Sequence, residues 1–443
     1  MKNGFYPSVF VRTLFGSLAA ILFFRPFAQA DPVYQADALV ESIGVNVQVW
    51  TGRGVGNGPV LHDKMVAAGV RHARDWLAID KPDAIPAWNA MTASGIHMCF
   101  TLTPGWGGIP AMRQFLITNG LVAGTALIEG PNEPNNGSGS WATSTVSFCT
   151  QLFAAFRSNP PTASLPILAP ALAIRASDMS PDHAALGDLS ALVDYGNAHP
   201  YPGGGLPLYN LVKELPLEKV NVGTKPMVVT ETGYHNALST ANGHNPASET
   251  ATALYLPRLY LEYLSQGVFR TYWFSLLDNY TDAGAAAKGL SDIEAHFGLV
   301  RYDFSEKPAY LALKNLITIM QDPGVTFAPS PFAFTVTGSS DVTNMLFQKR
   351  NGDYYLAVWR QVSVWNAGSR VDIVPASTNI TVSFTNTPEN ASIFYPTTSP
   401  DAAGLYNNVT AVQIPLQGQV AIVKLSNIGS GIQAPTIQPK KSS

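Results

Sequence analysis

The chain repeats one pattern of apolar and polar positions from about residue 43 to residue 320. Each repeat begins with a short apolar or β-branched run, continues through a loop rich in Gly, Pro and Asn, and ends in a stretch with helical apolar spacing. This alternation is typical of parallel strands joined by crossover helices. Eight such runs are present, at Ile43–Val49, Val70–Arg74, Ile96–Leu102, Thr125–Gly130, Ile167–Ala169, Tyr195–His199, Met227–Thr230 and Phe269–Ser275. The pattern therefore predicts an α/β protein with a (β/α)8 barrel of the TIM type.

An open, doubly wound sheet is the alternative reading of the same pattern. That fold carries a G-x-G-x-x-G turn after its first strand and at the start of a helix. The glycines at 52, 54, 56 and 58 follow the first predicted strand, but they lack this spacing and context. We interpret the segment as a flexible loop of the barrel.

After Met320 the pattern changes from helical spacing to alternation, with turn signals such as Asn351-Gly352. Several short alternating runs predict an all-β module, which we interpret as a β-sandwich. Its role is open between binding a ligand and covering a face of the barrel. We therefore predict four regions: a signal peptide over 1–30, a catalytic barrel over 31–321, a sandwich over 322–428 and a disordered tail over 429–443.

The first thirty residues have the three parts of a secretory signal. Lys2 and Arg12 form a basic start, Leu14–Phe24 is apolar, and Ala28 and Ala30 provide small residues at the cleavage position. A membrane anchor is the alternative, but this apolar stretch is shorter than the roughly 20 residues that a spanning helix needs. We expect a secreted or periplasmic protein with no stable membrane insertion.

Composition and charge narrow the class of partner. The 443 residues are 46% hydrophobic and 13% charged, which suits a packed chain with one large and one small domain. The net charge of -3 provides no basic surface for a phosphate backbone, so we expect no nucleic-acid partner. Cys99 and Cys149 are expected to be two buried thiols rather than a disulfide, and their spacing fits no metal site.

Chemistry in such a barrel lies at the carboxyl ends of the strands. The fourth predicted strand runs into Asn132-Glu133-Pro134, and the seventh into Thr230-Glu231, so each places a carboxylate at the rim. Hydrolysis of a glycosidic bond with retention uses two carboxyl groups roughly 5 Å apart, one as acid/base and one as nucleophile. The alternative for Glu133 is a structural role at a helix start, where Asn is a good cap and acidic residues are favourable.

These two strand ends resemble those of clan A of the glycoside hydrolases, and the resemblance is strongest to families 39 and 5. It covers about residues 42 to 320 and includes Ser42–Asn46, Val70–Arg74, His199–Tyr201, Phe297–Val300 and Lys307–Leu313. The resemblance implies an enzyme that hydrolyses O-glycosyl compounds, with Glu133 as acid/base and Glu231 as nucleophile. It also implies that Asn132 holds the 2-hydroxyl of the sugar. No metal or organic cofactor is needed for this mechanism.

Three further polar residues are predicted to support the carboxylates. Arg74 ends the second strand and would lie near the nucleophile, where a fixed cation keeps a carboxylate ionised; its alternative is a surface ion pair with Asp75. His199 and Tyr201 follow the sixth strand, where the resemblance implies a hydrogen bond to the nucleophile or to the substrate. A hydrogen-bonded core histidine is the other reading of His199.

Aromatic side chains near the strand ends could stack on sugar rings. Trp273 at the end of the eighth strand is the first candidate, and Trp106 on a glycine-rich loop is the second. Trp50 either stacks on a sugar or packs in the core.

Together these features predict a monomeric glycosidase that acts on an oligo- or polysaccharide. A non-catalytic carbohydrate-binding barrel and a transglycosylase with the same carboxylates are the alternatives, and the sequence leaves the sugar and the linkage open. The negative charge of Glu231 is expected to raise the pKa of Glu133, which would give a bell-shaped pH profile.

Overall fold

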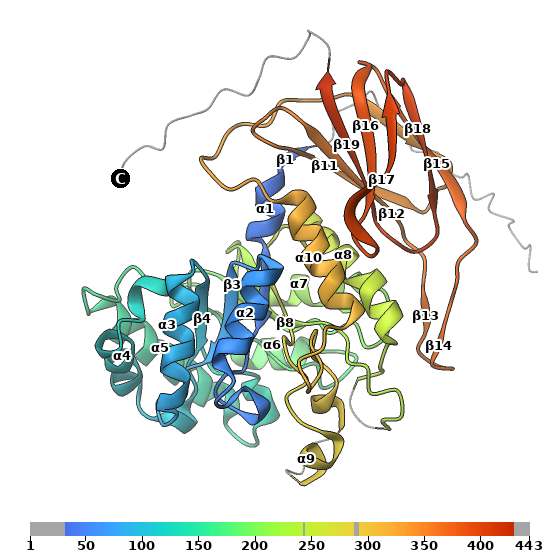
Figure 1. The fold of residues 1–443 in the computed structure, drawn as a ribbon. Coiled ribbons are helices and arrows are strands. Elements are labelled where there is room, and N and C mark those ends of the chain that lie inside the picture. The colour runs from blue at the N-terminus through green and yellow to red at the C-terminus, as the bar shows by residue number, and fades with distance from the viewer. Residues whose placement is uncertain (1–31, 242–243, 288–291, 429–443) are drawn as a thin grey trace, which may run out of the picture.

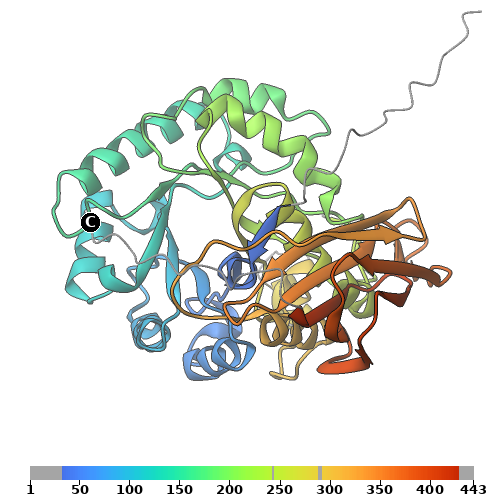
Figure 2. The same cartoon turned by 90° about the horizontal axis from the view of Figure 1, so that it is seen from above.

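The structure is a computed structural model that describes residues 32–241, 244–287 and 292–428. It has two domains, a barrel and a β-sandwich that packs against one side of it (Figures 1 and 2). The predicted signal peptide and tail lie outside the described residues. Within the described ranges, no helix is both long and apolar enough to cross a membrane.

The barrel contains all eight predicted strands, and every pairing between them is parallel. The strand order is β6-β5-β4-β3-β2-β9-β8-β7, and a bridge between Leu168 and Tyr195 joins the two ends of this sheet. The fold class predicted from the sequence is therefore confirmed. The strands are β2 (Ile43–Asn46), β3 (His72–Trp76), β4 (His97–Thr101), β5 (Thr125–Glu129), β6 (Ile167–Leu168), β7 (Gly196–Ala198), β8 (Met227–Thr232) and β9 (Val268–Trp273).

Helices surround the barrel, and the longer ones bury apolar residues at helical spacing. In α5, for example, Cys149, Leu152 and Phe156 recur at helical spacing and are buried. The helices are α1 (Ala36–Glu41), α2 (Gly58–Ala68), α3 (Ile85–Ala93), α4 (Ile109–Thr118), α5 (Trp141–Arg157), α6 (Ser180–Leu186), α7 (Leu208–Val222), α8 (Glu249–Ser265), α9 (Asp282–Ala287) and α10 (Pro308–Met320). Short 3-10 turns include η3 (Pro104–Trp106), η5 (Pro134–Asn136) and η6 (Asp292–Ala295).

The barrel interior is filled in layers. The lower layer is a small apolar cluster of Cys99, Leu127, Leu168, Val228 and Tyr272. The Tyr272 ring lies so close to Gly44 that a Cβ there would be 2.4 Å from it, so this position requires glycine. Two residues further along the strands the inward positions become polar, and this upper layer forms the floor of the mouth. Both cysteines are buried free thiols, as predicted.

The C-terminal module is all-β, as predicted, with two sheets that enclose their own apolar core. One sheet has the order β1-β11-β12-β19-β16-β17, and the other β10-β15-β18. A two-stranded ribbon, β13-β14, extends from the module alongside the barrel (Figure 1). The strands are β10 (Phe334–Thr337), β11 (Val342–Gln348), β12 (Tyr354–Arg360), β13 (Trp365–Asn366), β14 (Val371–Asp372), β15 (Thr378–Phe384), β16 (Pro388–Tyr395), β17 (Ser399–Asn407), β18 (Ala411–Leu416) and β19 (Ala421–Ile428).

The two domains share strands and hydrogen bonds. Strand β1 (Val33–Gln35) falls in the range predicted for the barrel, yet it pairs in parallel with β11 of the sandwich. Helix α8 is buried between the domains, where Arg258 donates to the carbonyl of Val362 at 2.7 Å. The Trp359 Nε1 in turn donates to Glu262 at 2.9 Å. These polar contacts fix the sandwich against the side of the barrel.

Candidate active site

The two rim carboxylates predicted from the sequence lie together at the mouth of the barrel. Glu133 follows β5 and Glu231 lies near the end of β8. One oxygen of each carboxylate and a ring nitrogen of His199 are all within 4.8 Å of one another. Two acidic groups that are 98 positions apart in the sequence are thus neighbours, because the carboxyl ends of parallel strands meet on one face of the barrel.

Arg74 organises the polar layer under these carboxylates. It lies on β3, its side chain is fully buried, and all five of its N–H groups donate to side chains. The alternative ion pair with Asp75 is not formed, because Asp75 points to the other side of the strand and accepts from the Trp88 Nε1 at 2.8 Å. The partners of Arg74 are Glu129 (Nε, 2.5 Å, and Nη2, 3.0 Å), Asn46 (Nη1, 2.8 Å), Glu231 (Nη1, 2.6 Å) and Asn132 (Nη2, 2.8 Å).

Glu129, for which no role was predicted, is the charge partner of Arg74 in this layer. Glu129 is fully buried and accepts further hydrogen bonds from Thr101, Asn197 and Thr230 at 2.7 to 3.0 Å. The signal was present in the sequence, because Glu129 is two residues after the inward-facing Leu127 and so faces the interior as well. A buried carboxylate with this many donors is structural, which leaves Glu133 as the accessible acid of the segment.

Glu231 is held by one donor on each oxygen. Arg74 donates to Oε1 at 2.6 Å, and the Tyr201 hydroxyl donates to Oε2 at 2.7 Å. Burial, and then the charge of Glu231, raise the pKa of Tyr201 well above its ordinary value, so the phenol stays a hydrogen-bond donor. Arg74 was predicted to lie near the nucleophile, and Tyr201 to hydrogen-bond to the nucleophile or the substrate. In the structure both residues donate to Glu231.

Glu133 has a strained backbone and a partly exposed side chain. Its φ of 43° lies in the left-handed region, which is unusual for a residue other than glycine. The N–H of Glu133 donates to the carbonyl of Ala171 at 3.1 Å, which helps to hold this conformation. The side chain is 24% exposed, and one of its oxygens accepts from the Asn136 amide at 3.0 Å. Backbone strain of this kind is concentrated at functional sites.

His199 and Glu133 share a proton. The His199 Nδ1 is 2.9 Å from Glu133, and its Nε2 is 3.0 Å from the Thr230 hydroxyl. The Thr230 hydroxyl has one hydrogen, and it donates this hydrogen to an oxygen of Glu129 or of Asn197, both of which can only accept. The hydroxyl therefore accepts from His199, so the imidazole Nε2 is the donor. The contact between Nδ1 and Glu133 then needs one proton, either on the imidazole or on the carboxyl group. This pair therefore holds a proton at the site.

The expected rise in the pKa of Glu133 is not found in the free protein. Burial by itself would raise it, but the His199 hydrogen bond and the charges of His199, Arg74 and His244 outweigh burial and lower the pKa of Glu133. For His199, burial opposes the charged form, while Glu231 and Glu133 outweigh it and raise the pKa. The predicted rise took only the charge of Glu231 into account, because the contact of Glu133 with a histidine 66 positions away is not visible in the sequence.

Asn132 lies beside Arg74, at the same rim. Its Oδ1 accepts from the Arg74 Nη2, so the amide nitrogen is the end that can donate to a sugar hydroxyl.

The two tryptophans predicted to stack on sugar rings differ in their exposure to solvent, since Trp273 is buried and Trp106 is partly exposed. Trp273 is fully buried, so it cannot present a face to a ligand, and its proposed stacking role is wrong. The next residue, Phe274, is the partly exposed aromatic of this strand end, with its ring centroid 6.3 Å from that of Tyr201. The prediction chose the wrong member of the pair because adjacent residues face opposite sides of a strand and the end of β9 was not known.

Trp106 lies in a cluster of three partly exposed tryptophans beyond β2, β3 and β4. Its ring centroid is 4.8 Å from that of Trp50 and 5.0 Å from that of Trp76, while Trp50 and Trp76 stack at 5.5 Å. Trp76 was not predicted, and Trp50 both packs and remains partly exposed. We call Trp50, Trp76 and Trp106 the tryptophan cluster.

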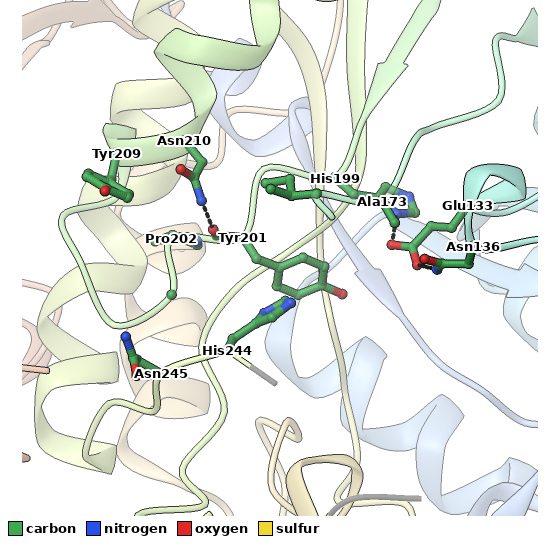
Figure 3. Close-up of a pocket in the computed structure, with 12 residues that line it drawn as sticks. Glu133, Asn136, Ala173, His199, Tyr201, Pro202, Tyr209, Asn210, His244 and Asn245 are labelled. Atoms are coloured by element: carbon green, nitrogen blue, oxygen red, sulfur yellow. Dashed lines mark hydrogen bonds and ion pairs between the residues drawn. The ribbon is translucent and has the colours of Figure 1, made fainter. Parts of the chain in front are cut away.

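A pocket of about 560 Å³ opens beside Glu133 on the other side of the mouth. Figure 3 shows its lining, with the Tyr201 ring near the centre and the His244 ring against it. The ring centroids of Tyr201 and His244 are 4.6 Å apart. His244 was not predicted, because it lies in a long loop with no motif. The lining residues include Glu133, Asn136, His199, Tyr201, Tyr209, Asn210, His244 and Asn245.

A further carboxylate, besides Glu129, lies near the catalytic candidates. Glu294 is on η6, and burial together with the charges of Glu231 and Glu133 raises the pKa of Glu294 to about 7. This group was also missed, since η6 follows the last strand of the barrel and shows no strand-end pattern.

Among the described residues, Glu133, His199 and Glu231 are the one set of acidic, His or Cys side chains whose atoms are close enough to bind a metal. Each already has a protein partner, and Glu231 is paired with the guanidinium of Arg74. A fixed positive charge at this distance opposes the binding of a cation, so the donor set fits a hydrogen-bonded carboxylate pair better than a metal centre.

Comparisons with known proteins relate the chain to others by fold. No family model matches it, and no curated protein matches it. A solved glucosidase from Croceicoccus marinus aligns over 88% of this chain and 96% of its own, with 11% identity and a TM-score of 0.56. A family 51 α-L-arabinofuranosidase from Bifidobacterium longum aligns over 90% and 98%, with 10% identity and a TM-score of 0.56.

The catalytic domain of a GH30 xylanase from Talaromyces cellulolyticus aligns over 90% of this chain and 98% of its own, with 11% identity and a TM-score of 0.50. At these identities the likeness shows a shared fold. The shared fold agrees with the barrel that the resemblance to clan A implies, whereas the resemblance to families 39 and 5 stays a prediction.

Proposed function

We propose that this protein is a retaining glycoside hydrolase that cleaves O-glycosidic bonds of an extracellular oligo- or polysaccharide. The observation that carries the proposal is the pair Glu133 and Glu231, with carboxylate oxygens within 4.8 Å of each other at the barrel mouth. Retaining enzymes have carboxyl groups about 5 Å apart, whereas inverting enzymes need about 6.5 Å or more to admit a water. The short separation supports attack by a carboxylate.

In this mechanism Glu231 attacks the anomeric carbon while Glu133 protonates the departing oxygen. Arg74 and Tyr201 hold Glu231 in one orientation and stabilise its negative charge. The proton shared by His199 and Glu133 is the one that Glu133 delivers to the leaving group. A water molecule, deprotonated by Glu133, then releases the sugar from Glu231.

The surroundings of the pair support a neutral glycan as substrate. The tryptophan cluster offers apolar faces beyond β2 to β4, and the polar pocket lies beyond β5 to β8, so Glu133 and Glu231 lie between two surfaces that suit sugar rings. The extracellular setting rests on the predicted signal peptide. The glucosidase, arabinofuranosidase and xylanase among the structural neighbours are consistent with a glycan substrate.

A carbohydrate-binding barrel and a transglycosylase are the competing functions. A binding protein has no need of a second carboxylate held by Arg74 and Tyr201 at attacking distance from the first. A transglycosylase would use the same two carboxylates and differ only in the acceptor.

The test is hydrolysis of a panel of aryl glycosides and soluble polysaccharides by the mature protein. Glu133→Gln and Glu231→Gln are run beside it, with the exposed Glu389→Gln as a matched control. We expect both site variants to lose nearly all activity, the control to keep it, and NMR of the first product to show a retained anomer. Equal cleavage by either site variant would refute the assignment, and added sugar acceptor distinguishes transfer from hydrolysis.

A further inference from the structure

The β13-β14 ribbon connects the sandwich to the mouth of the barrel. It comprises β13, β14 and the turn 367–370, and we call it the arm. Figure 1 shows that it leaves the sandwich and runs down beside the barrel. It hydrogen-bonds to the segment between β8 and α8, whose described residues, 233–241 and 244–248, we call the β8 loop.

The arm holds the β8 loop through three backbone carbonyls. The Trp365 Nε1 donates to the carbonyl of Pro246 at 2.7 Å, with the indole ring buried. Arg370 donates to the carbonyls of Leu238 at 2.5 Å and Thr240 at 2.6 Å. Hydrogen bonds from a charged donor are stronger than neutral ones, so one guanidinium fixes two points of the loop.

The β8 loop provides the outer wall of the pocket beside Glu133. His244 and Asn245 line the pocket, and both are exposed to solvent. His235 fixes the position of His244, since its ring nitrogen hydrogen-bonds to the carbonyl of His244 at 2.8 Å. The wall is therefore held by the arm at Pro246 and by His235 at His244.

Gly204 shows how tightly the arm and the two loops pack. It has a φ of +76° and lies in the loop after β7. A Cβ at this position would be 2.7 Å from the carbonyl oxygen of Pro246 and 3.0 Å from Ala367 of the arm. The arm and both pocket loops thus meet at a point with no room for a side chain, and a displacement of the arm would displace the wall.

The position of the pocket indicates which part of a substrate it would bind. It is lined by Glu133 but not by Glu231. Glu133 gives its proton to the departing oxygen, so the sugar next to Glu133 on its outer side is the leaving group. The lining offers hydroxyl, amide and imidazole groups, and its volume of about 560 Å³ is within the range of ligand pockets.

We infer that His244 and Asn245 form a leaving-group subsite for a neutral sugar, and that Trp365 and Arg370 of the sandwich domain position this subsite. The inference rests on the proposed glycosidase function. It gives the C-terminal domain a role in substrate selection, through the arm, in addition to its packing against α8.

The experiment compares two substrates that share a glycone, a nitrophenyl glycoside and the matching oligosaccharide with a sugar as leaving group. Trp365→Phe keeps an aromatic ring, though a smaller one, and removes the donor, whereas Arg370→Ala removes both carbonyl contacts. Arg350→Ala is the matched control, because Arg350 binds Asp322 and the carbonyl of Pro323, which belong neither to the arm nor to the β8 loop. Melting temperature is measured for every variant.

We expect each arm variant to lower kcat/KM for the oligosaccharide about tenfold, mainly through KM, because the wall of the subsite is displaced while the carboxylates stay in place. kcat for the nitrophenyl glycoside should stay within about twofold of the wild type. His244→Ala should also lower kcat/KM for the oligosaccharide, and adding Arg370→Ala to it should cause little further loss on that substrate, because the two residues act through one wall.

Several results would overturn the inference. If the arm variants lose equal activity on both substrates, the arm has a general structural role. If kcat/KM of the arm variants equals that of the wild type on both substrates, the arm does not position the subsite. Either failure leaves the proposed function intact, provided that the wild type cleaves both substrates. If the wild type cleaves no glycoside, the proposed function fails and this inference fails with it.

Discussion

Replacing Arg74 with methionine tests whether the polar layer of the barrel is one cooperative unit. Methionine fills much of the volume of the arginine stem but removes the charge and all five donors. Glu129, which is fully buried, then loses its cation and keeps only neutral donors from Thr101, Asn197 and Thr230. Removing one partner of a buried ion pair costs about 3–5 kcal/mol. Because three donors remain, we expect about 3 kcal/mol of lost stability.

The assay is urea denaturation followed by tryptophan fluorescence and circular dichroism. Arg175→Met is the matched control, because Arg175 forms a surface pair with Asp182 and should cost less than about 1 kcal/mol. The double variant Arg74→Met with Glu129→Gln removes the orphaned charge. It should regain about 1–3 kcal/mol relative to the sum of the single variants.

Two results would refute this reasoning. One is an unfolding midpoint for Arg74→Met that is indistinguishable from that of the wild type. The other is simple additivity in the double variant, which would mean that Arg74 and Glu129 do not stabilise each other. Glycosidase activity should be lost in both variants, since Glu231 has lost a donor in each.

Three other changes test separate parts of the site. Tyr201→Phe removes the donor to Glu231 and should lower kcat about 10- to 100-fold with little change in melting temperature; an unchanged kcat would show that the 2.7 Å hydrogen bond is not used in catalysis. Glu214 on α7 is buried, and burial raises its pKa from 4.5 to about 8, so the native state keeps a proton that the unfolded chain releases between these values. Its contribution to stability is therefore greatest below pH 4.5 and declines as the pH rises to about 8, by roughly 5 kcal/mol. Glu214→Gln should flatten the dependence of the urea midpoint on pH between 5 and 8, and parallel curves would contradict this explanation. Trp106→Ala should raise KM for oligosaccharides about tenfold and leave short aryl glycosides unaffected, whereas equal effects on both would indicate that the tryptophan cluster only packs.

The sequence by itself determined the barrel and its two rim carboxylates. Strand and helix patterns are local, so eight repeats were countable without any knowledge of contacts. The rule that parallel strands present their carboxyl ends on one face then placed Glu133 and Glu231 on the same rim, and the structure brings them within 4.8 Å of each other. Arg74, His199 and Tyr201 were found in the same way, as polar residues at strand ends.

Only the tertiary structure decided which polar and aromatic residues are accessible. Glu129 and Glu133 are four positions apart in one segment, and closure of the barrel buries the first against Arg74 while leaving the second partly exposed. Trp273 and Phe274 differ in the same way: β9 ends at Trp273, which is buried, and the next residue, Phe274, is partly exposed.

Two further sets of contacts are visible only in the folded chain. They are the contact of His199 with Glu133 and the hydrogen bonds of the arm to the β8 loop. These contacts join residues 66 to 132 positions apart, and no local pattern encodes such a pair. The sequence sets which face of a strand a residue occupies, but the packing of distant segments sets its charge environment and its access to solvent.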